Sequence, residues 1–303
     1  MSGSAKTAER IEELKKEKNA VLLVHNYQRP EIQDLADHIG DSLGLSIAAT
    51  KTNADVIVFC GVDFMAESAK ILNPDKIVVH PNPKAKCPMA AMVTANDVLE
   101  LKTAHPKADV VAYVNTTAAV KAVVDICCTS ANAVKVVKSL SAQEIIFIPD
   151  INLGLYVKRF FPNKEFYYSQ GYCHVHQGIM KSQLKQLKTQ YPEAEVLVHP
   201  ECTPEVIDFA DFVFSTEGMA KHVKSSDTEE FIVGTEKELT YRLARENPGK
   251  VFHRVDTALC HAMKQITIED VLHSMENLTP EIKLSNEIIE NAKRPLQRMI
   301  DIV

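Results

Sequence analysis

Three cysteines share a spacing that suits a common metal centre. Cys87, Cys173 and Cys260 follow one another at intervals of 86 and 87 residues in a chain of 303 residues. Their thiolates suit an iron–sulfur cluster or zinc. Three thiolates leave one position of the metal open, which a metal needs to act as a Lewis acid. The spacing predicts a catalytic metal centre, with ordinary buried cysteines as the alternative.

The other four cysteines do not follow this spacing. We interpret Cys60, Cys127, Cys128 and Cys202 as small core residues. A total of seven cysteines is odd and low for a disulfide scaffold of this length. No pair has the C-x₂-C spacing of zinc fingers and ferredoxins, so we expect reduced thiols or widely separated metal ligands.

Pairs of polar residues recur at the ends of apolar runs with almost the same period. The pairs are His25/Tyr27, Tyr113/Asn115 and His199/Glu201, with offsets of 88 and 86 residues. Residues i and i+2 of a strand point to the same face, and open α/β sheets bind ligands at the carboxyl ends of their strands. Three such pairs predict a site whose Tyr, His and Glu side chains transfer protons. A single pair would equally suit a hydrogen-bonded core position.

Three hydroxyl residues share this period, and one histidine lies close to a phased cysteine. Ser42, Ser130 and Thr216 are also offset by 88 and 86 residues, and each precedes a predicted helix. They suit N-caps or, if the helix ends face one centre, a binding site for carboxylates or phosphate. His176 follows the second cysteine by three residues. We place it beside the metal or the substrate, because a fourth protein ligand would close the open position.

Short apolar runs alternate with amphipathic segments along the whole chain, which predicts α/β layers with right-handed crossovers. Non-alternating runs rich in β-branched residues are typical of parallel strands that are covered on both faces. Ten of them are predicted as strands: 21–24, 56–59, 77–79, 110–113, 145–148, 166–168, 196–198, 212–214, 231–233 and 251–252. Capping boxes are predicted at Thr94/Asp97 and Thr235/Glu238, and a long helix over 281–302 is expected to pack across a domain.

The three phased series predict a threefold internal repeat. Each copy reads β-α-β-α-β followed by a cysteine, with an extra strand near Phe231 in the last copy. The predicted fold class is therefore α/β, with three similar small domains whose cysteines meet at a shared centre. The predicted domains are 1–88, joined by the carboxyl-terminal segment 263–303, then 89–175 and 176–262.

The composition excludes several classes of protein. Hydrophobic residues make up 46% and charged residues 24%, as in ordinary soluble globular proteins. A net charge of -6 gives no electrostatic support for a nucleic-acid partner. No apolar run reaches the roughly 18 residues that span a bilayer, and the charged amino terminus lacks the apolar region of a signal peptide. We expect a cytoplasmic protein; a homodimer is compatible with these features.

Seven stretches of the chain resemble the quinolinate synthase family of bacteria and archaea. They are His25-Asn-Tyr27, Tyr113-Val-Asn-Thr116, Asp125-Ile-Cys-Cys-Thr-Ser-Ala-Asn-Ala-Val134, His199-Pro-Glu-Cys202, Ser215-Thr-Glu-Gly-Met219, Phe231-Ile-Val-Gly-Thr-Glu236 and Cys260-His-Ala-Met-Lys264. They occur in order over nearly the whole chain. The resemblance implies three α/β domains around a pseudo-threefold axis, with parallel sheets in αβα layers and the active site at the centre. It also implies a 4Fe–4S cluster held by three cysteines, which match Cys87, Cys173 and Cys260.

The resemblance further implies an activity in NAD biosynthesis. The family condenses iminoaspartate (iminosuccinate) with dihydroxyacetone phosphate to quinolinate, phosphate and water, and we expect the open iron to assist dehydration as a Lewis acid. Tyr27, Glu201 and His25 match or suit groups that transfer protons, and His176 matches a histidine near the cluster. The substrate-binding positions are expected at His25, Ser42, Tyr113, Val114, Asn115, Ser130, His199, Pro200, Glu201 and Thr216. A transient contact with the enzyme that makes the unstable iminoaspartate is a further expectation.

The chain departs from the family pattern at three positions. Ala91 stands where an acidic residue usually follows the first cysteine, His261 where proline often follows the last, and Glu217 where serine is usual. Two other functions remain open at this point. One is a zinc-dependent lyase that uses the same three thiols, and the other is a non-catalytic iron–sulfur or redox-sensing module.

Overall fold

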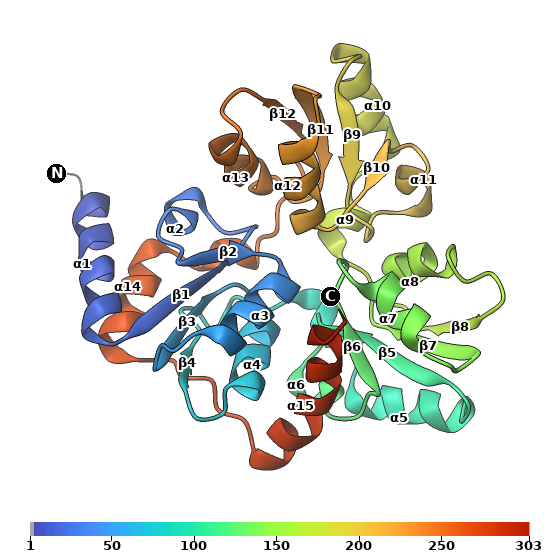
Figure 1. Ribbon diagram of the computed structural model, residues 1–303, viewed down its shortest axis with the longest axis horizontal. Helices are drawn as coiled ribbons and strands as arrows, with labels where there is room; N and C mark the ends of the chain where they lie inside the picture. Colours follow the sequence, from blue (N-terminus) through green and yellow to red (C-terminus); the bar gives the residue numbers. More distant parts are fainter. Residues whose placement is uncertain (1–2, 303) are drawn as a thin grey trace.

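The computed structural model describes residues 3–302, and within this range the chain forms three four-stranded sheets. Every strand pairing in the three sheets is parallel. Figure 1 shows the sheets as three lobes, each flanked by helices, around a common centre. The predicted fold class, three similar α/β units, is confirmed.

The first unit has the strand order β2-β1-β3-β4. Its elements are α1 (Gly3–Glu17), β1 (Ala20–His25), α2 (Pro30–Gln33), β2 (His38–Gly40), α3 (Ser42–Lys51), β3 (Val56–Cys60), α4 (Asp63–Leu72) and β4 (Ile77–Val79). Successive residues of β1 point to opposite faces of the sheet. Leu23 packs on the face covered by α3 and α4, and Leu22 packs on the face covered by α1. Burial of each leucine contributes about 1.5–3 kcal/mol, so a strand covered on both faces is strongly held.

The second and third units repeat this strand order, as β6-β5-β7-β8 and β10-β9-β11-β12. After a 3₁₀ turn at Pro88–Ala91, the second unit contains α5 (Ala95–Ala104), β5 (Asp109–Tyr113), α6 (Ala118–Lys121), β6 (Ile126–Cys128), α7 (Ala133–Ser139), β7 (Glu144–Ile148), α8 (Ile151–Lys158) and β8 (Glu165–Tyr168). The third contains α9 (His174–Gln177), α10 (Lys181–Gln190), β9 (Glu195–Val198), α11 (Pro204–Ile207), β10 (Phe212–Val213), α12 (Thr216–Ser225), β11 (Glu230–Gly234), α13 (Leu239–Glu246) and β12 (Val251–Arg254).

The predicted repeat is wrong in one respect, because every unit has four strands. The strand near Phe231 is therefore not an extra one; the predictions instead missed β2 and β6 in the first two units. Both missed strands are only three residues long, and His38 at the start of β2 is exposed. In β2 (His-Ile-Gly) only one residue is apolar, and in β6 (Ile-Cys-Cys) the cysteines were interpreted only as core residues.

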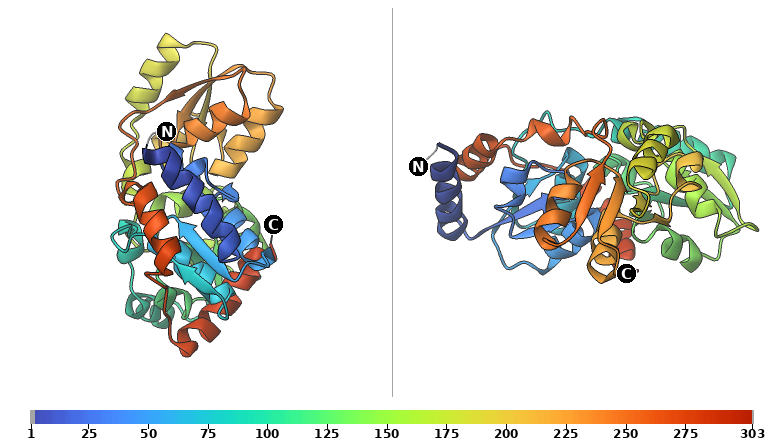
Figure 2. Two further views of the ribbon diagram at one scale, coloured as in Figure 1. Left: turned by 90° about the vertical axis from the view of Figure 1, so that its left-hand side faces the viewer. Right: turned by 90° about the horizontal axis from the view of Figure 1, so that it is seen from above.

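The carboxyl-terminal segment joins the units. A 3₁₀ turn at Met263–Gln265 leads to α14 (Ile268–Asn277), which lies beside α1 at the edge of the first unit (Figure 2). The predicted last helix begins later than expected, as α15 (Asn286–Ile300), because Glu281 instead forms an antiparallel bridge with Val79. The long helix α15 packs against α4 of the first unit and against α6 and β6 of the second.

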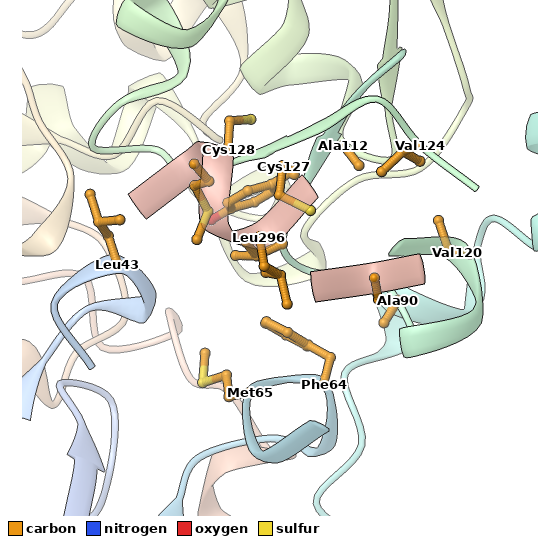
Figure 3. Close-up of a cluster of buried hydrophobic side chains, with 14 of the residues drawn as sticks. Leu43, Phe64, Met65, Ala90, Ala112, Val120, Val124, Cys127, Cys128 and Leu296 are labelled. Atoms are coloured by element: carbon orange, nitrogen blue, oxygen red, sulfur yellow. The ribbon is translucent and has the colours of Figure 1, made fainter. Parts of the chain in front are cut away.

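Figure 3 shows the apolar cluster at this junction, where Leu296 of α15 lies with Phe64 of α4 and Cys127 of β6. The helix thus joins two units through one core, as expected for a segment that packs across a domain. The domain boundaries near residues 88, 175 and 262 stay predictions. No helix within residues 3–302 is long and apolar enough to cross a membrane.

Candidate active site

The strands of all three units direct their carboxyl ends toward one cavity of about 710 Å³, part of which is open to solvent. A site at the carboxyl ends of parallel strands is typical of ligand binding in α/β proteins. The cavity is lined by predicted site residues from each unit, namely His25, Tyr27, Ser42, Cys87, Tyr113, Asn115, Ser130, Cys173, His176, His199, Glu201, Thr216 and Cys260. Val114 and Pro200 are buried outside this lining, and Val114 packs in the hydrophobic core. Their contact with substrate stays a prediction.

Three of the seven free cysteines differ from the rest. Cys87, Cys173 and Cys260 follow the last strand of their units and are half-buried at the cavity, whereas the other four are buried in the cores as predicted. Burial raises the pKa of the Cys87 thiol to about 12 and also raises the pKa of Cys173 and Cys260. Because a bound metal displaces the thiol proton, three such thiols fit a metal centre that takes one ligand from each unit.

A chain of hydrogen bonds runs along the cavity wall from one tyrosine to another. Tyr113 Oη donates to Glu201 Oε1. The other carboxylate oxygen, Oε2, lies 2.7 Å from His176 Nδ1, and His176 Nε2 lies 2.8 Å from Thr235 Oγ1. Thr235 Oγ1 is also 2.6 Å from Tyr27 Oη. Two side chains, His176 and Thr235, therefore connect Glu201 with the phenol of Tyr27, which is the arrangement needed to move a proton between them.

The electrostatics of this chain favour a carboxylate beside neutral phenols. Burial acts to raise the pKa of Glu201, but His176, His199 and the hydrogen bonds from His176 and Tyr113 together lower it well below its usual value. Burial and the nearby charge of Glu201 raise the pKa of both Tyr27 and Tyr113 well above the usual value. At neutral pH Glu201 is thus the proton acceptor, and the tyrosines keep their protons.

Two histidines at strand ends are held in one tautomer. The backbone N–H of Tyr27 donates to His25 Nδ1 at 3.1 Å, and that of Glu201 donates to His199 Nδ1 at 3.3 Å. Because Nδ1 accepts, each neutral ring carries its proton on Nε2. Burial lowers the pKa of both histidines to about 3. They are therefore neutral N–H donors, and that of His199 lies 3.1 Å from Ser130 Oγ.

The three phased hydroxyls are not N-caps, so that alternative is wrong. Ser42 and Thr216 are the first residues of their helices, and the caps are the preceding Asp41 and Ser215, whose side chains accept from Gly44 N at 2.8 Å and Gly218 N at 3.2 Å. Ser130 lies two residues before Asn132, which flanks α7. The cap positions leave all three predicted hydroxyls free to line the cavity.

Sequence reasoning missed two polar residues that support the site. Thr235 was predicted to cap a helix, but α13 begins at Leu239 after Glu238, which makes no side-chain cap, so the predicted capping box is wrong. The box at Thr94/Asp97 is confirmed. Asn26, which lies between the two residues of the first pair, donates from Nδ2 to Thr216 Oγ1 at 2.8 Å.

Two local features shape the ligand space. Gly234 ends β11 so close to β9 that an added Cβ would lie 2.8 Å from Val198 Cγ1. This close approach lets the strand end carry Thr235 up to His176. The Oδ1 atom of Asn115 is buried without a hydrogen-bond partner in the described part of the chain. Such an acceptor at a cavity suits a donor group of a ligand.

The three departures from the family pattern do not interrupt these contacts. Ala91 and His261 are exposed beside their cysteines. Glu217 pairs with Arg242 at 2.9 Å and lines a neighbouring groove, not the cavity itself.

One other donor set could hold an ion. Cys173, His176 and Glu201 each offer a ligand atom, and these atoms lie within 4.8 Å of one another. Both oxygens of Glu201 and both nitrogens of His176, however, already have hydrogen-bond partners. An ion there would have to replace these bonds.

These features define an α/β protein of three similar units that share one acid–base cavity beside three thiols. The chain belongs to the quinolinate synthetase A protein family, whose sequence profile matches residues 9–301. The predicted family is thereby confirmed.

Three relatives illustrate how far the similarity extends. The chain is 50% identical over 298 residues to a quinolinate synthase of Aquifex aeolicus (strain VF5). This match covers 96% of the chain and 92% of the relative. It is 53% identical over 293 residues to the quinolinate synthase of Geotalea uraniireducens (strain Rf4), with 96% of each covered. It is 50% identical over 301 residues to that of Methanoregula boonei (strain DSM 21154 / JCM 14090 / 6A8), with 99% of each covered.

Proposed function

We propose that this chain is a quinolinate synthase of NAD biosynthesis that condenses iminoaspartate with dihydroxyacetone phosphate to quinolinate, phosphate and water. The names of its relatives support the activity. The observation that carries the proposal is the single cavity in which thiols from all three units adjoin the acid–base chain that contains Glu201.

Cys87, Cys173 and Cys260 would hold a 4Fe–4S cluster in this proposal. A cluster bound by three thiolates supplies a Lewis-acidic iron with an open position, which favours loss of a hydroxyl group as water. The support is the chemistry of the donor set: three free thiols, one from each unit, that line a cavity.

Neutral donors would hold the anionic groups of the substrates. Both substrates are anions, with two carboxylates on one and a phosphate on the other. The Nε2–H groups of His25 and His199 and the hydroxyls of Ser42, Ser130 and Thr216 donate to such groups without adding charge. The unpartnered amide oxygen of Asn115 would accept from a donor of the iminoaspartate or of a later intermediate. Tyr113 and the backbone around Val114 and Pro200 would complete the binding surface.

Proton transfers would use the chain from Tyr27 to Glu201. Isomerisation, ring closure and water loss each need a proton moved to or from a carbon, nitrogen or oxygen atom of the substrate. Ionised Glu201 accepts a proton through His176, while Tyr27 is positioned by Thr235 to donate one. His25, which lies 4.7 Å from Tyr27 between ring centroids, would orient the reacting group.

Thr235→Val is expected to lower kcat about ten- to one-hundred-fold with little change in KM. A fall in kcat of this size corresponds to the loss of one buried hydrogen bond in the transition state. The change keeps the shape of the side chain but removes the hydroxyl that joins Tyr27 to His176. Steady-state kinetics would measure it, with Thr240→Val as the control, because that hydroxyl donates only to Lys237 O in the described structure. Equal kcat in the two variants would contradict a role for Thr235 in the chain.

A zinc-dependent lyase is the second candidate, and the close grouping of Cys173, His176 and Glu201 favours it. The existing bonds within that group weigh against it. Nothing in the cavity favours a sensor module, which has no need of the acid–base chain.

The proposal also includes the three domains with boundaries near residues 88, 175 and 262, a cytoplasmic location, and a transient contact with the enzyme that makes iminoaspartate.

The activity is tested directly by product analysis. Anaerobically purified protein would be mixed with dihydroxyacetone phosphate and iminoaspartate formed in situ from oxaloacetate and ammonia, and quinolinate would be measured by mass spectrometry. Product is expected only when both substrates are present. Absence of quinolinate from protein that carries its full iron and sulfide would contradict the proposal.

A further inference from the structure

We infer that the carboxylates of Asp63, Asp150 and Glu236 are positioning residues. They hold the three cysteine loops, which are the segments between the last strand of each unit and Cys87, Cys173 or Cys260. In this way they determine how firmly the thiols hold a metal centre. The inference rests on the proposed cluster. It is drawn from a threefold set of contacts that lies behind the cavity wall.

The three carboxylates occupy the same place in their units. Each follows the third strand and accepts a hydrogen bond from the backbone N–H of the cysteine 23 or 24 residues later. The distances are 3.1 Å from Cys87 N to Asp63 Oδ1, 3.0 Å from Cys173 N to Asp150 Oδ2, and 3.2 Å from Cys260 N to Glu236 Oε1.

A backbone hydrogen bond reinforces each contact. In each unit an N–H at or directly after the carboxylate residue donates to the carbonyl two residues before the cysteine. The bonds are Asp63 N to Ala85 O at 2.9 Å, Ile151 N to Gly171 O at 2.9 Å and Lys237 N to Ala258 O at 2.8 Å. Each cysteine loop is thus clamped at two points to the end of its own third strand. At Gly171 the clamp is so tight that an added Cβ would lie 2.6 Å from Pro149 O.

Burial makes these carboxylates costly unless they are hydrogen-bonded. The side chains of Asp150 and Glu236 belong to fully buried residues, at 0% exposure. The backbone N–H groups of Cys173 and Cys260 supply such hydrogen bonds. A cysteine whose N–H is held in this way keeps its backbone, and therefore its thiol, in a fixed direction. Groups that orient metal ligands typically change metal affinity or activity by about 10–100-fold when removed.

The second unit depends most on its carboxylate. Glu236 is paired with Lys264 at 3.0 Å, and buried Lys121 interacts electrostatically with Asp63. Asp150 has no ion pair among residues 3–302, and its two oxygens accept from Leu153 N at 2.8 Å and from Cys173 N. The two bonds reach different oxygens, and in an asparagine one of these atoms is an NH₂ group, which donates and cannot accept. Asp150→Asn should therefore loosen the Cys173 loop, because its one oxygen must serve both Leu153 N and Cys173 N.

The same fold supplies a matched control. Asp37, Asp125 and Asp211 also repeat through the three units, and each accepts from a backbone N–H of the first strand 15 residues earlier. For Asp211 the donor is Val196 N at 2.8 Å. None of these three residues lines the cavity. Asp211→Asn thus weakens a carboxylate–backbone bond at an exposed position, where Lys188 lies 3.9 Å away, without touching a cysteine loop.

The test compares Asp150→Asn with Asp211→Asn and the wild-type chain. After anaerobic reconstitution, iron release to a chelator would be followed by absorbance. We expect release about 10–100-fold faster from Asp150→Asn, and within about twofold of wild type from Asp211→Asn. Thermal unfolding of the cluster-free chains would show how much stability each variant loses. Asp63→Asn and Glu236→Gln provide the same test at the other two loops if Asp150→Asn does not fold.

Two outcomes overturn the inference. One is wild-type release rates in all three cysteine-loop variants, and the other is release from Asp211→Asn as fast as from Asp150→Asn, which would indicate general destabilisation. A wild-type chain that takes up no iron and sulfide would instead contradict the proposed cluster. Hydrogen–deuterium exchange of the Cys173 amide in the cluster-free chain then decides the anchoring: faster exchange in Asp150→Asn alone supports it, and unchanged exchange refutes it.

Discussion

Glu201→Gln is expected to lower kcat for quinolinate formation by about 10²–10⁴-fold, the usual contribution of a positioned acid–base group. The glutamate accepts from Tyr113 and His176 through its two oxygens. A glutamine keeps one acceptor, places an NH₂ group against the other donor and removes the negative charge. Steady-state kinetics on protein of measured iron content would separate this loss from a loss of the metal centre.

Glu195→Gln is the matched control for this change. Glu195 begins the same strand β9 that Glu201 follows, and its carboxylate also binds a histidine and a hydroxyl, His222 at 2.8 Å and Thr228 at 2.7 Å. It does not line the cavity. We expect kcat within about twofold of wild type, because the lost contacts are near the surface. A similar fall in both variants would mean that Glu201 acts on stability and not on proton transfer.

Replacing any one of Cys87, Cys173 or Cys260 with alanine is expected to abolish quinolinate formation. Each unit supplies one thiol to the cavity, so loss of one leaves two protein ligands for a centre that needs three. The assay is quinolinate formation after anaerobic reconstitution, with iron and sulfide measured on the same samples. Normal turnover by any of the three variants would contradict the proposed mechanism.

Cys60→Ala is the control for the cysteine series. This cysteine ends β3 in the first unit and is buried in the core away from the cavity. Its replacement removes one buried sulfur atom and should cost stability, about 1 kcal/mol, while activity is kept. Loss of activity in this variant as well would show that the series reports folding and not metal binding.

The sequence predicted most of the fold because its signals are local or periodic. Runs such as Val56–Cys60 contain β-branched and apolar residues without alternation, which is typical of strands covered on both faces. The phased cysteines and strand ends then indicated three copies. The strands β2 and β6 were not predicted because His-Ile-Gly and Ile-Cys-Cys lack the run of β-branched residues that marks a strand such as Ile77–Val79.

The predicted site residues came from strand ends, whose position along a strand is readable from sequence. Their contacts were not readable, because the bond between His176 and Thr235 joins residues 59 positions apart. Thr235 was mistaken for a cap since a Thr followed three residues later by Glu is the usual pattern of a capping box. The anchoring carboxylates share the period of the cysteines, at offsets of 87 and 86 residues. Among 40 acidic residues, however, such a match carries little weight until the contacts are seen.

Iron, acid-labile sulfide and zinc per chain, measured after strictly anaerobic purification, test the proposed metal centre most directly. About four iron and four sulfide per chain, with little zinc, are expected if three thiols hold a 4Fe–4S cluster beside the acid–base chain. The Cys173→Ala variant should contain little of either. Zinc without sulfide would contradict the cluster and favour the lyase, and a chain that binds no metal after reconstitution would contradict both.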